Sequence, residues 1–224
     1  MASDTYWSNY YSEVTQRGEG WLDYSNPAVQ AQTLALCLES AGQIHGHPCL
    51  DVGCGRGQLA AMLRDLGGAP VIGVDFIEAL VEEDRARFPG IDFRHGDACD
   101  ETFLATLPPM DRIFAVEVLQ CLEAATVLPR LWERLGPGGR LVCMVPHAPC
   151  PIVRRVRERM ADRYHALDVA GAAAIAARLE GLSDWLVRGL TFGEDQRVAP
   201  YRTSAWGHDV QGVPNRLNLV FLKN

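Results

Sequence analysis

The stretch LDVGCGRGQLA at positions 50–60 constrains the fold of this chain more than any other feature. An apolar run leads into glycines at positions 53, 55 and 57, and a helical pattern, GQLAAMLRDLGG, follows directly. A buried strand, a glycine turn and a helix in that order are typical of the first unit of an open α/β sheet. Because glycine has no side chain, the turn lets the backbone come close to a ligand, and the free amides that begin the helix favour a carboxylate or a phosphate.

The alternation of strand and helix patterns continues as far as Pro146. Its segments are PVIGVDF, IEALVEEDRARF, IDFRHGDA, DRIFAVEVL, TVLPRLWERLGPGG and RLVCMVPH. Such alternation implies parallel strands with crossover helices, so we expect a doubly wound, Rossmann-like α/β sheet with helices on both faces. No internal repeat or low-complexity linker interrupts residues 1–224, and this length suits a single domain.

The pattern changes after Pro146. Residues 147–182 are long enough for two helices before the next strand, DWLVRGLTF, and we expect them to form a helical insertion over the active site. A final strand, RLNLVFLKN, follows without an intervening helix. Two late strands joined in this way predict an antiparallel hairpin at the edge of the sheet.

Composition narrows the class of partner. Hydrophobic residues make up 48% and charged residues 22% of the chain, and no window approaches the length of a membrane span. The N-terminus, MASDTYWSNYYSEV, lacks the basic and apolar regions of a secretory signal, so we expect a cytoplasmic protein. A net charge of -7 disfavours nucleic acid and favours a small-molecule partner. The seven scattered cysteines predict reduced thiols, and the six histidines show no metal-ligand spacing.

Residues at the strand ends should carry the function, because ligands of open α/β sheets bind at the carboxyl edge of the strands. The second strand ends in Asp75, eighteen residues after Gly57, where a carboxylate can accept bonds from ribose hydroxyls. A dinucleotide-binding turn would have its third glycine at position 58, where this chain has Gln58. These features together favour an adenosine-like ligand.

At these residues the sequence resembles the class I S-adenosylmethionine-dependent methyltransferases. Their opening motif is an acidic residue followed by three alternating glycines, and residues 51–57, DVGCGRG, match it. The resemblance continues in order through VIGVDF, FRHGDA, DRIFAVEVLQCL and LGPGGRLV. It implies a seven-stranded sheet, mostly parallel with an antiparallel last strand, and S-adenosyl-L-methionine as cofactor, with S-adenosyl-L-homocysteine as its product.

The resemblance also implies roles for single residues. Gly53 and Gly55 would line the methionine moiety, Asp75 would bind the ribose, and Asp51 would anchor the amino group directly or through water. Other implied cofactor contacts are Cys54 and Gly57 in the loop, Phe76 and Ile77 at the adenine face, Asp97 and Ala98 at its amine and ring edge, and Val116 and Glu117 near the methionine part. Two alternatives stay open, since Phe76 could be core and Glu117 could cap the next helix.

The sequence contains weaker signals for the residues that bind the methyl acceptor. A common family variant has a histidine after the fourth strand, but this chain has Gln120-Cys121-Leu122 there. His147, directly after the fifth strand, is therefore the first candidate for a general base, with a hydrogen-bonded loop residue as the alternative. Tyr164 in the insertion, and Tyr201 and His208 before the last strand, are further substrate candidates.

An aromatic N-terminus, residues 1–26, completes the predicted site. A similar opening in small-molecule methyltransferases forms a flap over the cofactor, which would bring Tyr6, Tyr10, Tyr11 and Trp21 to the sulfonium or the substrate. The alternative is a helix fixed to the core by its aromatic residues. Arginines between positions 154 and 163 form either a solvated helix face or a means of attracting an anionic acceptor.

The sequence therefore predicts an enzyme that moves a methyl group from S-adenosylmethionine to O or N of a small organic molecule, with no metal, as a monomer or homodimer. The composition is compatible with bacterial specialised metabolism. The alternatives are a nicotinamide-dependent oxidoreductase and a non-catalytic regulatory subunit that binds S-adenosylmethionine.

Overall fold

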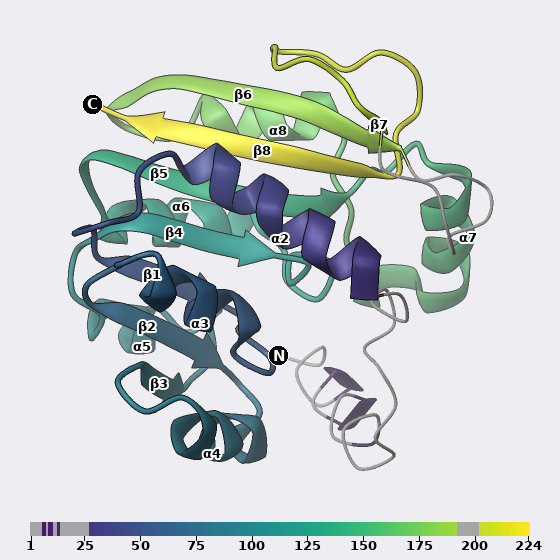
Figure 1. Cartoon of the computed structure of the whole chain (residues 1–224). Coiled ribbons are helices and arrows are strands. Elements are labelled where there is room, and N and C mark those ends of the chain that lie inside the picture. The colour runs from purple at the N-terminus through teal and green to yellow at the C-terminus, as the bar shows by residue number, and fades with distance from the viewer. Residues whose placement is uncertain (1–5, 8, 11–12, 14–26, 192–201) are drawn as a thin grey trace.

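The computed structural model describes residues 6, 7, 9, 10, 13, 27–191 and 202–224. Its central feature is an eight-stranded sheet with the order β3-β2-β1-β4-β5-β8-β6-β7, which spans the whole molecule (Figure 1). The strands are β1 (Cys49–Val52), β2 (Val71–Asp75), β3 (Asp92–His95), β4 (Met110–Val116), β5 (Leu135–Pro146), β6 (Leu182–Thr191), β7 (Arg202–Thr203) and β8 (Arg216–Lys223).

The first five strands pair in parallel, and β8 runs antiparallel to both of its neighbours, β5 and β6. The doubly wound, mostly parallel sheet with an antiparallel last strand is therefore confirmed. The predicted antiparallel pairing of the two late strands is also confirmed, since β6 pairs with β8 at one end of the sheet. One detail differs from expectation: the two-residue strand β7 forms the outer edge and raises the number of strands from seven to eight, and β8 lies between β5 and β6. The first six residues of β8 are buried, which suits an interior strand, whereas both residues of β7 are exposed at the edge.

Helices cover both faces of this sheet (Figure 1). Their bounds are α2 (Pro27–Ala41), α3 (Gln58–Asp65), α4 (Glu78–Arg87), α5 (Glu101–Ala105), α6 (Ala124–Arg134), α7 (Pro151–Met160), the 3₁₀ helix η1 (Ala161–Arg163) and α8 (Val169–Ala176). One apolar core joins the sheet to α5, α6 and α8, and a second joins it to α2, α3 and α4. Side chains along β1 point alternately into the two cores, since Leu50 and Val52 enter the first core and Cys49 enters the second.

The order of the strands positions the site. From β1 the chain proceeds to β2 on one side, whereas β4 lies on the other, so the loops after β1 and β4 diverge and leave a crevice at the carboxyl edge. The predicted insertion, residues 147–182, divides in two. Residues of α7 reach the cavity at this edge, while α8 packs against α6 and β6. All seven cysteines are free thiols and six are buried, as predicted. Within the described part of the chain, no helix has the length and apolar character needed to cross a bilayer.

Candidate functional site

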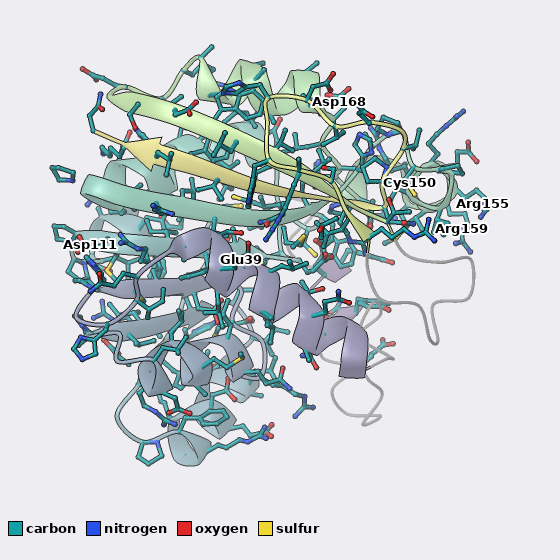
Figure 2. All side chains as sticks on the ribbon, turned by 45° about the horizontal axis from the view of Figure 1, so that its top comes forward. Glu39, Asp111, Cys150, Arg155, Arg159 and Asp168 are labelled. Atoms are coloured by element: carbon teal, nitrogen blue, oxygen red, sulfur yellow. The ribbon has the colours of Figure 1, made fainter. Side chains whose placement is uncertain are left out.

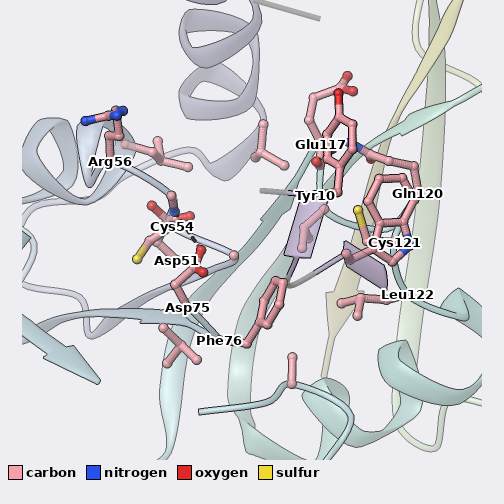
Figure 3. A pocket seen from close by; sticks show the side chains of 18 of the residues that line it. Tyr10, Asp51, Cys54, Arg56, Asp75, Phe76, Glu117, Gln120, Cys121 and Leu122 are labelled. Atoms are coloured by element: carbon pink, nitrogen blue, oxygen red, sulfur yellow. Dashed lines mark hydrogen bonds between the residues drawn. The ribbon is translucent and has the colours of Figure 1, made fainter. Parts of the chain in front are cut away.

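A cavity of about 450 Å³ opens at the carboxyl ends of β1, β2 and β4. Figure 3 shows Asp51, Cys54 and Asp75 on one side, with Tyr10, Gln120 and Cys121 across from them. We call the first side the acidic half, defined by Asp51, Gly53, Gly55, Asp75 and Asp97. We call the second the aromatic half, defined by Tyr6, Trp7, Tyr10, Gln120, Cys121, Leu122, Arg159, Met160 and Tyr164.

The glycine loop forms the floor of the acidic half. Gly53 and Gly55 have φ values of 68° and 55°, in the left-handed region that favours glycine. The Gly53 amide donates to the Val74 carbonyl at 2.8 Å, which ties the loop to β2. A Cβ at Gly53 would lie 2.4 Å from Val118 Cγ2, whereas a Cβ at Gly55 would have no other atom within 4 Å. Gly55 therefore leaves room in the cavity wall that any side chain would fill.

Asp75 holds the loop from the end of β2. Its Oδ2 accepts from the Gly55 amide at 2.9 Å, and its Oδ1 accepts from the Ile77 amide at 3.0 Å. Burial raises the pKa of this carboxyl, and the two amides act in the opposite direction. Because each carboxylate oxygen can accept more than one bond, Asp75 keeps acceptor capacity for a ligand hydroxyl.

Asp51 is a buried carboxyl with an unsatisfied atom. Only 3% of the residue is exposed, and its Oδ2 has no hydrogen-bond partner among the described residues. Burial, together with the charges of Asp75 and Asp84, raises the pKa of Asp51 to about 7, against an opposing bond from the Ala60 backbone. A cationic or hydrogen-bond-donating ligand would satisfy this oxygen.

Glu117 lies between the two halves, just after β4. Its φ of 52° is unusual for a residue other than glycine, and its Oε1 accepts from Arg216 Nε at 2.8 Å. Both side chains are buried, so the ion pair is shielded from solvent. Helix α6 begins at Ala124 with Glu123 as its N-cap, so Glu117 pairs with Arg216 on β8 instead of capping that helix. Sequence reasoning missed Arg216, because the register of β8 against β5 was not readable.

The loop after β3 carries Asp97 and Ala98, which we expect to contact the adenine. The Asp97 carboxylate accepts from the Cys99 amide at 2.7 Å, which stabilises the turn, and both residues line the cavity. Phe76 lines the cavity too, and it packs partly buried against the cluster around Trp7. Cys54 and Val116 are further predicted residues found in the lining.

Three N-terminal side chains form the outer wall of the aromatic half. Trp7 is 3% exposed and its indole Nε1 donates to the Arg163 carbonyl at 2.9 Å. Tyr10 packs edge-on against Trp7, with the ring centroids 5.8 Å apart. Tyr6 and Tyr10 line the cavity, and Tyr164 joins them from beyond η1. The other predicted aromatic residues, Tyr11, Trp21 and Tyr201, lie outside the described residues.

One face of α7 closes this half. Val156, Arg159 and Met160 line the cavity at spacings of three and four, which place side chains on one side of a helix. Sequence reasoning noted the arginines of this segment without identifying the one that faces the cavity. The available signal was the pair of apolar residues Val156 and Met160, which stand three and one positions from Arg159.

His147, the predicted base, differs from expectation. The residue is 4% exposed, its Nδ1 lies 3.0 Å from the Pro214 carbonyl, and its amide donates to the Asn215 carbonyl. Burial lowers the pKa of the imidazole. His147 is not among the residues that line the cavity. It thus matches the alternative of a hydrogen-bonded loop residue, since its amide and its ring both bond to the segment that precedes β8.

Three other predicted residues also lie away from the cavity lining. A Cβ at Gly57 would meet the Phe93 ring at 2.9 Å, so this glycine permits packing behind the loop. Ile77 is buried in a separate apolar cluster. His208 is exposed and bonds Asp184 at 2.9 Å.

The donor set of the acidic half fits S-adenosylmethionine. The unsatisfied Asp51 oxygen suits an ammonium group, the space over Gly55 suits an amino-acid tail, and Asp75 suits ribose hydroxyls. Carboxylates also suit a ligand with net positive charge.

Comparison with known proteins agrees with this geometry. Residues 49–139 match the family model described as a methyltransferase domain. The chain is 34% identical over 139 residues to trans-aconitate 2-methyltransferase of Methylobacterium nodulans, covering 61% of this chain and 53% of that protein. It is 33% identical over 147 residues to protein-L-isoaspartate O-methyltransferase of Anaeromyxobacter dehalogenans, covering 63% of this chain and 66% of that protein. The chain spans about half the length of the trans-aconitate methyltransferases that it matches.

Solved structures share the fold over most of the chain. Magnesium protoporphyrin IX methyltransferase of Synechocystis, with bound S-adenosylhomocysteine, has a TM-score of 0.64 at 16% identity and covers 97% of this chain and 96% of its own. The sequence motifs, the strand order and the matched domain lead to one conclusion: this chain contains a methyltransferase domain with the fold of the class I S-adenosylmethionine-dependent methyltransferases, whose cofactor is S-adenosylmethionine.

Proposed function

We propose that this protein transfers a methyl group from S-adenosylmethionine to O or N of a small organic molecule. The observation that carries the proposal is one cavity with two chemically different halves, an acidic one on the glycine loop and an aromatic one beneath the N-terminal segment and α7. Its volume of about 450 Å³ is in the usual range for small-molecule sites. The relatives named for trans-aconitate also support a small acceptor.

The chain's own residues have binding and orienting roles in this proposal. Asp75 binds the ribose and at the same time holds the Gly55 amide, so the ligand and the loop share one carboxylate. Asp51 pairs with the ammonium group. When bound, the cofactor supplies an electrophilic methyl group on a positively charged sulfur.

Alignment and exclusion of water are what such a displacement demands of the protein. The aromatic half supplies both, because Trp7 is anchored to Arg163 and its ring is buried. No histidine lines the described cavity, so the acceptor atom gives up any proton without an imidazole base.

The test combines binding with turnover. We expect S-adenosylhomocysteine to bind the purified protein in calorimetry, and Asp75→Ala to weaken it about a hundredfold, since a charge-assisted bond and the loop's anchor are both lost. Asp65→Ala, an exposed position on α3 away from the lining, is the matched control and should bind as the wild type does.

Methyl transfer is then measured with S-adenosylmethionine labelled in its methyl group and trans-aconitate as the first acceptor. Equal affinity in Asp75→Ala and wild type would overturn the proposed cofactor site. Displacement of S-adenosylhomocysteine by NADH would favour the oxidoreductase alternative. Tight binding of S-adenosylmethionine without turnover of any acceptor would favour the regulatory subunit. Location in the cytoplasm and a monomeric or homodimeric state stay predictions.

A further inference from the structure

Two arginines line the described cavity, and they differ in their partners. Arg56 Nη1 lies 3.1 Å from Glu83 Oε1, so a carboxylate already neutralises it. Arg159 has no carboxylate partner among the residues that the structure describes. Among the described residues of the lining, Arg159 is therefore the arginine whose charge is not neutralised by a neighbouring carboxylate.

Arg159 belongs to the aromatic half because of its position on α7. Val156 and Met160, its neighbours at spacings of three and one, line the same wall, and Figure 2 shows Arg159 on this helix. Arg157 lies two residues earlier, on the other side of the helix, and does not line the cavity, although both arginines are exposed. The sequence pattern does not distinguish these two arginines, whereas the packing of α7 brings Arg159 into the cavity lining and leaves Arg157 outside it.

The two halves of the cavity carry charges of opposite sign. The acidic half has the carboxyls of Asp51, Asp75 and Asp97, whereas the described lining of the aromatic half has none. An anionic group is therefore repelled from the first half and attracted to Arg159 in the second. Most of the remaining wall there is apolar or aromatic, including Trp7, Leu122 and Met160, and suits a planar or apolar body.

The aromatic half also contains a buried polar atom that has no hydrogen-bond partner among the described residues. Gln120 is 7% exposed, its Nε2 donates to the Glu117 carbonyl, and its Oε1 has no hydrogen-bond partner among the described residues. Figure 3 shows Gln120 beside Cys121 at the cavity. A buried acceptor of this kind calls for a ligand that donates a hydrogen bond.

We propose that the acceptor is a carboxylic acid with an apolar body and a hydrogen-bond donor, and that Arg159 is the residue that binds its carboxylate. This inference rests on the proposed methyl transfer for the meaning of the aromatic half. Arginine suits the role because its guanidinium can give two parallel bonds to one carboxylate. Arg159 then determines specificity without taking part in binding the cofactor.

The probes are para-hydroxycinnamate and its neutral amide, titrated by calorimetry into protein saturated with S-adenosylhomocysteine. We expect the acid to bind the wild type at least about tenfold more tightly than the amide. Arg159→Gln should remove that preference, and Arg157→Gln, the matched control on the opposite side of α7, should retain it. S-adenosylhomocysteine should bind all three proteins equally.

Equal binding of acid and amide to the wild type would overturn the proposal, and so would an unchanged preference in Arg159→Gln or absence of binding by both probes. Failure of S-adenosylhomocysteine to bind the wild type is a separate result, which contradicts the proposed function instead. Cofactor affinity thus distinguishes the two failures.

Discussion

The two halves of the cavity are built in different ways. The acidic half comes from the carboxyl ends of β1 and β2 and from the loops that follow β1 and β3, so neighbouring parallel strands fix its residues. The aromatic half draws on residues 6, 7 and 10, on residues 120–122, and on residues 159, 160 and 164, which are far apart in the chain. Cofactor recognition is therefore a local property of the sheet edge, whereas acceptor recognition depends on how appended segments pack.

The junction between the halves should be the most sensitive point. Arg216→Met leaves the Glu117 carboxylate buried without its ion-pair partner, and we expect a loss of about 3 kcal/mol in the free energy of unfolding, measured by urea denaturation. The double variant Arg216→Met/Glu117→Gln should recover part of this loss. A single variant as stable as the wild type would show that the pair does not support the site.

Replacing Asp51, in the acidic half, should stabilise the protein, whereas Arg216→Met should destabilise it. Its pKa is about 7 in the folded protein and 3.8 ordinarily, so the folded state binds more protons between these values. The stability of the ligand-free protein therefore falls as pH rises from about 4 to 7 and levels off above that.

Asp51→Asn removes the ionisable group and with it this loss of stability at higher pH. We expect the variant to gain on the order of 2 kcal/mol over the wild type between pH 5 and pH 8, measured by denaturation at each pH. Affinity of the wild type for S-adenosylhomocysteine should increase as pH rises through 7, and the variant should lack this dependence. Parallel pH profiles of the two proteins would contradict the role of Asp51.

Two glycines of the loop can be compared directly, because Gly53 is needed for packing against Val118 and Gly55 leaves space in the cavity. Gly53→Ala should destabilise the protein by about 2 kcal/mol, since the new methyl clashes with Val118, and Val118→Ala should relieve part of the loss. Gly55→Ala meets no clash and should cost about 1 kcal/mol for its left-handed φ.

Gly55→Ala should nevertheless lower affinity for S-adenosylhomocysteine about tenfold, because its methyl occupies cavity space. Calorimetry and thermal denaturation of both variants check this pair. Undiminished affinity in Gly55→Ala would show that the ligand does not lie on the loop.

The smallest effect is expected at His147. Because the ring is buried against Pro214 and does not line the cavity, His147→Gln should change kcat by less than about twofold, with the same pH dependence as the wild type. A loss of a hundredfold or more, restored by imidazole, would reinstate it as the base.

The same contrast explains what the sequence could predict. Asp75 is the last residue of β2 and the glycine loop directly follows β1, so strand and turn patterns located them. Arg216 and Arg159 could not be located in this way, because their roles depend on the register of β8 and on which side of α7 faces inward. The sequence predicted the pairing of the two late strands but not their order, since hairpin connectivity does not reveal which strand lies inside.

The division of the cavity is the central claim, and a crystal structure with S-adenosylhomocysteine tests it most directly. We predict ribose hydroxyls on Asp75, the amino-acid tail over Gly53 and Gly55 with its ammonium near Asp51, and the sulfur facing the aromatic half. A nucleoside bound among Tyr10, Leu122 and Met160, or outside the cavity, would contradict the account.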